Sequence, residues 1–367
     1  MSAVISYCTN VHPAEDLDGI RAQLARYAEP VRRRLGAGTL GVGLWLAAEV
    51  AAHLARDQAE LARLRAELDD RGLAVRTLNA FPYRGFHDPV VKHRVYRPRW
   101  TEAGRLAYTL DCAEVLAGLL PDGAGGSIST LPLGWREPWS DTDDTAARHH
   151  LDRLATGLRR LEQRSGRRVR VAVEPEPGCV LDTVADALGW LKGTDPDYLG
   201  LCLDTCHLAV SFADAAETVR AIRAASVDIV KIQASAALHV DDPGDRQVRA
   251  ELARYAEPRY LHQVRERAAD GALTAADDLP EALAELPGDG PWRVHFHVPV
   301  HWEARGALRP TTDVLRTVLA EVEGPLPHVE VETYTWTVLP GPPADLAEGI
   351  AAELAFTQDL IDQRGCA

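Results

Sequence analysis

Short apolar runs alternate with longer amphipathic stretches along most of the chain. The runs are rich in Val, Ile and Leu, and the stretches between them carry Ala and Leu at helical spacing with Arg and Glu interleaved. Near-continuous apolar strands that alternate with helices indicate a parallel sheet covered by helices. The strands that this pattern predicts cover residues 4–8, 40–46, 74–80, 127–133, 168–173, 201–204, 229–233 and 329–333.

Repeated strand–helix units of this number fit an α/β protein with a closed (β/α)8 TIM barrel. No GxGxxG motif follows the first strand, which disfavours an open dinucleotide-binding sheet. In a TIM barrel the C-terminal ends of all strands meet on one face, and this face carries the chemistry. We therefore expect four strand-end residues to converge there, namely Glu174, Asp204, Gln233 and Glu332.

The segment between Gln233 and Glu332 is about twice as long as one strand–helix unit requires, and it contains another strand-like run at 292–301. Either 229–233 or 292–298 could be the seventh barrel strand, with the other inserted beside it. The intervening stretch 241–291, with a helix expected at 249–269, is predicted to be an elaboration over the active face. We predict one TIM-barrel domain over residues 1–367, with this insertion before the eighth strand.

Composition narrows the class of protein. The net charge of −14 disfavours nucleic-acid binding, which depends on clustered Lys and Arg. The first residues lack the charged and apolar regions of a secretory signal, and no stretch approaches the roughly 20 apolar residues of a membrane span. We expect a soluble, cytoplasmic protein without membrane insertion. The six cysteines lack CxxC spacing, so neither a zinc knuckle nor a redox pair is indicated.

The sixth strand ends in an acid, Asp204, with His207 three residues further on. A buried carboxylate is costly unless a positive partner or a metal ion meets it. The alternative is that Asp204 caps the next helix and that His207 lies on the surface. The long loop 81–99, rich in Pro, Tyr and Arg, is typical of an active-site wall or lid.

Carboxylates from several strand ends, with one His or Gln and water, make a site for a divalent ion such as Mg²⁺ or Mn²⁺. A His among the ligands favours Mn²⁺, Co²⁺, Fe²⁺ or Zn²⁺ over Ca²⁺. Such an ion polarises a substrate carbonyl and hydroxyl, while a neighbouring carboxylate removes a proton from carbon. This is the chemistry of an isomerase or epimerase.

The strand-end motifs resemble those of the xylose-isomerase-like (sugar phosphate isomerase/epimerase) TIM barrels. The resemblance implies one divalent metal ion, an acid/base pair formed by Glu174 and Glu332, and His207 close to the substrate as a further catalytic residue. The run at 295–298 matches the strand-seven pattern of that family better than 231–233 does. The metal ligands that the resemblance implies are Glu174, Asp204, Glu332 and either Gln233 or His297. The epimerases of this superfamily carry an arginine shortly after the strand-seven histidine. This sequence has Glu303 or His239 there, which argues against the way in which those epimerases hold a ketose substrate.

More narrowly, the runs at 6–13, 77–82, 174–178 and 231–235 resemble the EboE metabolite-traffic protein family. Proteins of that family are encoded beside a prenyltransferase-like and a sugar-phosphate-cyclase-like protein. The resemblance implies a sugar-like or cyclitol-like ligand, a small polyhydroxylated metabolite, without defining the reaction. Candidate substrate-binding residues on the active face are His12, Asn79, Trp135 and His207.

Three functions remain open from the sequence. The first is a metal-dependent sugar or cyclitol isomerase or epimerase, and the second is a non-catalytic metabolite-binding protein that uses the same pocket. The third is a multi-metal phosphoester hydrolase of endonuclease-IV type, for which His295, His297 and His301 would supply extra ligands. Barrels of this superfamily often form dimers or tetramers, so the resemblance also leaves a homo-oligomer open.

Overall fold

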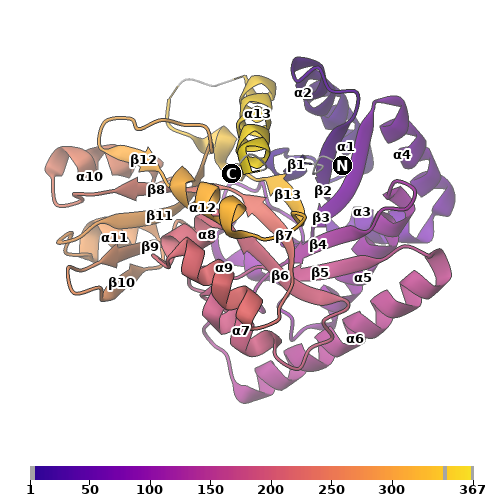
Figure 1. Ribbon diagram of the computed structural model, residues 1–367, viewed down its shortest axis with the longest axis horizontal. Helices are drawn as coiled ribbons and strands as arrows, with labels where there is room; N and C mark the ends of the chain where they lie inside the picture. The colour runs from indigo at the N-terminus through magenta and orange to yellow at the C-terminus, as the bar shows by residue number, and fades with distance from the viewer. Residues whose placement is uncertain (1–4, 342–344, 365–367) are drawn as a thin grey trace.

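Eight parallel strands close into a barrel in the computed structural model, which describes residues 5–341 and 345–364 (Figure 1). Their order around the barrel is β1-β13-β7-β6-β5-β4-β3-β2. The strands are β1 (Ile5–Cys8), β2 (Leu40–Trp45), β3 (Leu73–Asn79), β4 (Gly126–Thr130), β5 (Val169–Val173), β6 (Leu199–Asp204), β7 (Ile229–Ala234) and β13 (His328–Val331). The predicted (β/α)8 TIM barrel is confirmed.

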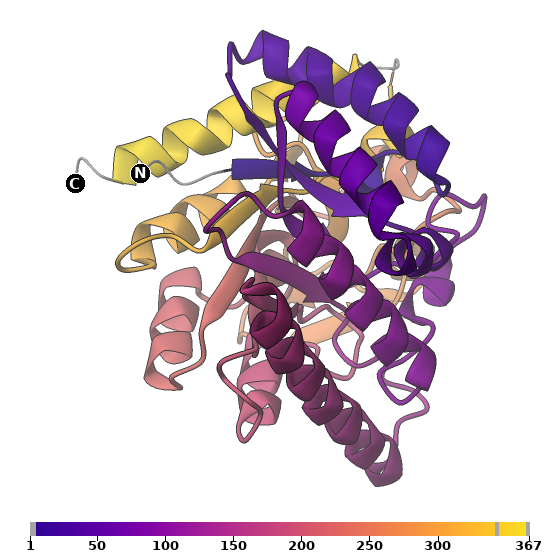
Figure 2. The ribbon, with the colours of Figure 1, turned by 90° about the vertical axis from the view of Figure 1, so that its right-hand side faces the viewer.

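Helices cover the outside of the barrel (Figure 2). They are α1 (Leu17–Gln23), α2 (Glu29–Arg34), α3 (Ala48–Arg56), α4 (Gln58–Asp70), α5 (Ala103–Leu119), α6 (Asp141–Ser165), α7 (Val184–Leu191), α8 (Thr205–Val210), α9 (Ala215–Ala224), α12 (Thr312–Glu321) and α13 (Leu346–Arg364). Ser140 and Asp143 form a capping box at the start of α6, and Gly166 ends that helix with a φ of 67°. Helix α13 packs against α2 and β1, so it joins the two ends of the chain. Within the described ranges, no helix has the length and apolar composition to cross a membrane.

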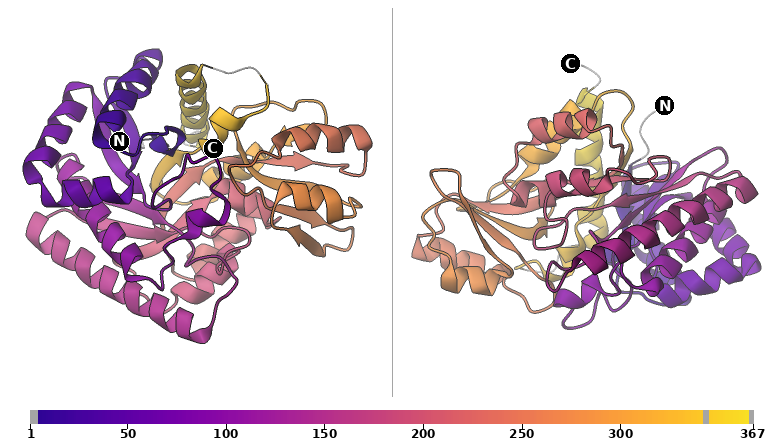
Figure 3. Two further views of the ribbon diagram at one scale, coloured as in Figure 1. Left: turned by 180° about the vertical axis from the view of Figure 1, so that it is seen from behind. Right: turned by 90° about the horizontal axis from the view of Figure 1, so that it is seen from below.

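A second sheet stands beside the barrel and is built from the chain between β7 and β13 (Figure 3). Its strand order is β10-β9-β11-β8-β12. The strands are β8 (Ala236–Val240), β9 (Val264–Arg267), β10 (Leu273–Ala276), β11 (Trp292–Val298) and β12 (Leu308–Pro310), accompanied by α10 (Arg246–Leu252) and α11 (Leu279–Glu285). Residues 229–234 pair with β6 and β13, so they form the seventh barrel strand, and 292–298 belong to the second sheet.

The prediction of a helix at 249–269 is wrong. Helix α10 ends at Leu252, and the chain becomes extended in β9. Pro258 disfavours a helical conformation for the residue before it. Farther on, Val264 and Glu266 both face inward, and Glu266 accepts hydrogen bonds from three backbone N–H groups and from Trp292 Nε1. A strand rather than a helix therefore satisfies this carboxylate.

Lys231 and Glu330 form a fully buried ion pair inside the barrel, with Nζ 2.6 Å from a carboxylate oxygen. The pair fits because β2 has a glycine opposite it. A Cβ at Gly43 would lie 1.4 Å from Glu330 Oε1 and 2.9 Å from Thr77 Cγ2. The glycine thus makes room for the carboxylate.

Gly43→Ala is therefore expected to lower the free energy of unfolding by about 3 kcal/mol, because it displaces one partner of a buried ion pair. Urea unfolding followed by circular dichroism measures this. Gly189→Ala is the control, since Gly189 is exposed in α7 and a Cβ there meets nothing within 4 Å. That variant should be unchanged or more stable by up to about 1 kcal/mol. Equal stabilities of the two variants would contradict the packing argument.

Glu353 of α13 ties the helix to the ends of β11 and β13. It accepts hydrogen bonds from Val300 N, Thr333 Oγ1 and Trp336 Nε1. Burial raises the pKa of Glu353 to about 7 from its usual 4.5. The folded state therefore holds this proton more tightly than the unfolded state does.

The stabilising contribution of Glu353 is complete below pH 4.5 and is lost as the pH rises toward 7. Between pH 5 and pH 8 the wild type should lose about 2 to 3 kcal/mol more unfolding free energy than Glu353→Gln, which cannot ionise. Urea titrations of both proteins at several pH values measure the difference. Parallel pH profiles would contradict the prediction.

Candidate metal centre

Three carboxylates converge at the C-terminal ends of the barrel strands. Asp204 is the last residue of β6, and Glu174 and Glu332 follow β5 and β13 directly. One oxygen from each lies within 4.8 Å of the others, and all three side chains are buried. The strand ends thus bring together three of the predicted site residues.

Asp204 serves two purposes. Its Oδ1 accepts hydrogen bonds from His207 N at 2.9 Å and from Ser235 Oγ at 2.8 Å, so it caps α8. Its Oδ2 is buried and has no hydrogen-bond partner among the described residues. Asp204 can therefore cap α8 with Oδ1 while Oδ2 stays free to take part in the site. His207, which the capping alternative placed on the surface, is buried.

Glu332 is held by three side-chain amides. Asn10 and Asn79 donate to its Oε1 at 2.6 and 2.8 Å, and Gln233 Nε2 donates to its Oε2 at 3.0 Å. These bonds orient the carboxylate and turn Gln233 Oε1 toward the interior, where it finds no partner in the described part of the chain. Gln233 of β7 thus contacts Glu332 and leaves one further buried oxygen without a partner.

The three buried carboxyl groups lie close together, and this affects their pKa values. Lys231 is paired with Glu330, and the ion pairs of the described residues give the carboxyl groups of Glu174, Asp204 and Glu332 no lysine or arginine partner. Burial raises the pKa of Glu174 well above its usual range, and repulsion from Glu332 and Asp204 raises it further. Burial and the charge of Asp204 also raise the pKa of Glu332.

Unpartnered buried oxygens are rare in native proteins and need an explanation. Over the described residues they include Glu174 Oε2, Asp204 Oδ2 and Gln233 Oε1, all at this site. An excess of buried carboxylates with free oxygen lone pairs is the donor set that divalent cations prefer. These residues therefore fit a divalent ion.

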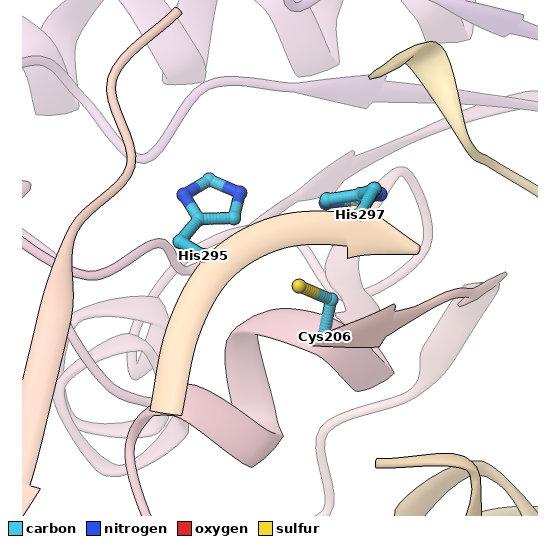
Figure 4. Close-up of side chains that lie close together, drawn as sticks. All are labelled: Cys206, His295 and His297. Carbon is cyan, nitrogen blue, oxygen red and sulfur yellow. The ribbon is translucent and has the colours of Figure 1, made fainter. Parts of the chain in front are cut away.

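Three histidines lie next to the carboxylates. His207 comes from α8, and His295 and His297 come from β11, outside the barrel. Figure 4 shows His295 and His297 of β11 close to Cys206 of α8, and the Cys206 sulfur and one ring nitrogen of each histidine lie within 4.8 Å of one another. The pairing of β11 with β8 is irregular between Val294 and Val298, and such bulges re-aim side chains. Burial lowers the pKa of His297 to about 4 and that of His295 well below its usual range, so both rings are neutral near pH 7.

A small cavity of about 60 Å³ adjoins the carboxylates and the histidines. Its wall is largely aromatic and apolar, with Phe81, Phe86, Val91, Tyr96, Tyr260 and Tyr334. Val91 N and Lys92 N both donate to Arg259 O, at 2.8 and 2.9 Å, and Lys92 pairs with Asp278. The loop after β3 and the inserted segment are thereby joined into a roof that limits the access of water.

The predicted substrate-binding residues divide into two groups. Asn79 and His207 line the cavity. His12 instead stacks on Tyr27 beside a separate small cavity, and Trp135 packs behind Tyr96. The structure does not bring His12 and Trp135 to the site.

Two residues that orient the carboxylates were not predicted. Asn10 lies in the short 3-10 segment after β1 and donates to Glu332, and Ser235 follows β7 and donates to Asp204. Each lies within two residues of the end of a barrel strand, which is the one sequence signal that could have indicated them. Glu176, two residues after Glu174, accepts hydrogen bonds from Tyr96 Oη at 2.7 Å and Gln263 Nε2 at 3.3 Å.

A larger hollow of about 840 Å³ lies at the opposite end of the barrel, around the N-terminal ends of the strands. Its arginines include Arg168 and Arg170, which pair with Asp197 and Asp228. TIM barrels carry their chemistry at the other end. We therefore assign the site to the smaller, carboxylate-lined cavity.

Fold and site together define a TIM barrel with a cluster of acids and histidines suited to metal binding. The family model described as "Xylose isomerase-like TIM barrel" matches residues 33–285, and the chain belongs to this family. No curated protein sequence matches the chain.

Solved structures with the same fold include several metal-binding and sugar-processing proteins. A xylose isomerase-like TIM barrel protein from Mycobacterium smegmatis in complex with magnesium is 13% identical, with a TM-score of 0.57 over 99% of this chain and 97% of that one. L-ribulose 3-epimerase is 13% identical, with a TM-score of 0.54 over 99% and 96%. The IOLI protein with a bound zinc atom is 14% identical, with a TM-score of 0.53 over 98% of both chains. At these identities the likeness concerns the fold alone.

Proposed function

We propose that this protein is a divalent-metal-dependent isomerase or epimerase that acts on a small polyhydroxylated, sugar-like metabolite. The observation that carries the proposal is the convergence of Glu174, Asp204 and Glu332 with free buried oxygens at the active face of the barrel. The fold likeness to a sugar epimerase and to magnesium- and zinc-binding barrels supports it.

The ion would be held by Glu174, Asp204, Glu332 and Gln233 Oε1. When bound, it would polarise a carbonyl or hydroxyl oxygen of the ligand and so acidify the neighbouring carbon. Gln233 rather than His297 completes this set, because Gln233 lies on the barrel strand and already contacts Glu332 at 3.0 Å.

Glu174 and Glu332 are the proposed acid/base pair. Glu174 has two carboxylate oxygens, so one can hold the ion while the other accepts a proton from carbon; its Oε2 would not have to give up a hydrogen bond in either role. Glu332 is oriented by the amides of Asn10, Asn79 and Gln233, so its position relative to the ligand is fixed. His207, also in the cavity, is proposed to assist the transfer. The aromatic roof limits the access of water, so these side chains rather than a water molecule remove the proton from the ligand and deliver one to it.

A narrower proposal concerns the EboE metabolite-traffic family and a cyclitol-like ligand. Four sequence runs suggested that relationship, and each supplies a residue to the site. The run 6–13 supplies Asn10, 77–82 supplies Asn79, 174–178 supplies Glu174, and 231–235 supplies Gln233. The shared motifs are thus concentrated around the ligand site.

Deuterium exchange tests the function. The protein, loaded with Mn²⁺, Co²⁺ or Zn²⁺, is incubated in D₂O with a panel of ketoses, aldoses and keto-cyclitols. Mass spectrometry and NMR then follow deuterium incorporation at the carbon next to the carbonyl. We expect metal-dependent exchange with at least one ligand, abolished by a chelator. Ligand binding without exchange for any member of the panel would overturn catalysis and leave a metabolite-binding protein.

A further inference from the structure

We propose a second ligand site in the hollow at the N-terminal end of the barrel, which would bind a small organic anion through its phosphate or carboxylate group. This hollow measures about 840 Å³ and lies at the opposite end of the barrel from the three carboxylates. The site goes beyond the proposed function, because it needs neither the metal ion nor the proton-transfer residues. Two arginines that line the hollow, Arg76 and Arg170, carry the proposal.

Polar side chains occupy the barrel interior at this end. Side chains on a strand point alternately to its two faces. Arg170 of β5 therefore faces the interior, as Glu174 does four residues later. Ser127 of β4 faces it as well, because it stands two residues before Ser129, which accepts a hydrogen bond from the buried Lys231. The interior of a TIM barrel is usually filled by bulky branched side chains. Serine and arginine in their place leave a polar hollow, which both residues line.

Arg76 of β3 brings an uncompensated positive charge to the hollow. Over the residues that the structure describes, its guanidinium forms no ion pair and no hydrogen bond, and its Nε is buried. A buried N–H group without an acceptor costs free energy and needs an explanation in a native protein. An anion bound in the hollow would supply the acceptor. The other arginines of the wall are already paired, namely Arg168 with Asp197, Arg170 with Asp228 and Arg223 with Glu323.

Arg170 is held in place and still has a donor to offer. Its Nη2 donates to Pro196 O and to Asp228 Oδ2, both at 2.9 Å, which fixes the guanidinium. Its Nε is buried and finds no acceptor in the described part of the chain. The Asp228 side chain is 67% exposed, so water screens this ion pair. A guanidinium presents several N–H groups in a planar fork that matches phosphate and carboxylate oxygens. Arg170 can therefore bind an anion without giving up Asp228.

The rest of the wall indicates an organic anion. Val219 and Ile222 of α9 line the hollow, as do Val322 and Leu326 at and beyond the end of α12. The C-terminal ends of helices carry partial negative charge, so an anion is better placed beside the strands that carry the arginines. Sites for small organic molecules typically measure about 300–1,000 Å³, and this hollow lies within that range. The charged group would thus contact Arg76 and Arg170, and an apolar part of the ligand would pack against the helices.

Isothermal titration with three anions tests the site. The anions are inorganic phosphate, phenyl phosphate and phenylacetate. Phenyl phosphate should bind more tightly than inorganic phosphate, because it adds apolar contacts. Its affinity relative to phenylacetate tells whether the site prefers a phosphate or a carboxylate group. Arg76→Met should weaken the binding of phenyl phosphate at least about tenfold, since it removes a charged hydrogen-bond donor. Arg160→Met is the matched control, because Arg160 is exposed on α6 and its loss changes the net charge equally. It should bind as the wild type does.

The outcomes separate this site from the metal centre. Binding that is lost in Glu174→Gln and kept in Arg76→Met would place the anion at the other end of the barrel and overturn the proposal. Equal affinities of Arg76→Met and Arg160→Met, or wild type that binds none of the three anions, would overturn it as well. Should Arg76→Met fail to fold, crystals of the wild type soaked in selenate decide. An anomalous selenium peak next to Arg76 and Arg170 supports the site, and a hollow without such a peak overturns it.

Discussion

Replacing Asp204 by asparagine is expected to lower the affinity for the divalent ion about 100-fold or more while leaving the fold intact. The substitution removes one negative charge and the free Oδ2 at the centre of the carboxylate group. Asparagine is as good a helix cap as aspartate, so the bond from His207 N is retained. Isothermal titration with Mn²⁺ measures the affinity, and circular dichroism measures the fold.

Two further variants make the result specific. Asp204→Ala removes the cap as well as the ligand, and it should also lose about 1 kcal/mol of stability. Asp214→Asn is the matched control, because Asp214 caps α9 in the same way, away from the site. It should bind Mn²⁺ as the wild type does. Unchanged affinity in Asp204→Asn would show that this carboxylate is no metal ligand.

Glu174→Gln is expected to slow proton exchange by about 10²- to 10⁴-fold, the usual contribution of a positioned acid/base group. The amide keeps the size of the side chain but can no longer accept a proton. The loss should appear in the exchange rate at saturating ligand, because the step affected is proton transfer rather than binding. Deuterium incorporation measured with metal-saturated protein checks this.

Glu176→Gln is the control for that prediction. Glu176 is the same residue type, equally buried and two positions away, but it accepts hydrogen bonds from Tyr96 and Gln263. We expect a change below about tenfold there. Equal losses in the two variants would mean that general damage to the strand end, and not proton transfer by Glu174, explains the effect.

The barrel and the three carboxylates could be predicted because both depend on local sequence. Each barrel strand is a short apolar run, and each carboxylate follows such a run directly, so barrel geometry alone brings Glu174, Asp204 and Glu332 together. Gln233 also lies at the end of a short apolar run. The sequence left open whether this run or 292–298 is the seventh barrel strand, and the pairing with β6 and β13 settles it.

The rest of the site depends on contacts that the sequence does not encode locally. His295 and His297 reach the barrel from a second sheet, through an irregularity in β11 that has no composition signal. His12 follows β1 just as Asn10 does, yet the turn of the 3-10 segment sends Asn10 to Glu332 and His12 to Tyr27. Side-chain direction after a strand end is set by tertiary packing, which one sequence does not reveal.

Anomalous diffraction from crystals soaked in Mn²⁺ locates the ion itself. We expect an anomalous peak at the C-terminal end of the barrel, with oxygens of Glu174, Asp204 and Glu332 about 2.0–2.2 Å from it. Crystals that show no peak among these three carboxylates at saturating Mn²⁺ would show that they do not form a metal site.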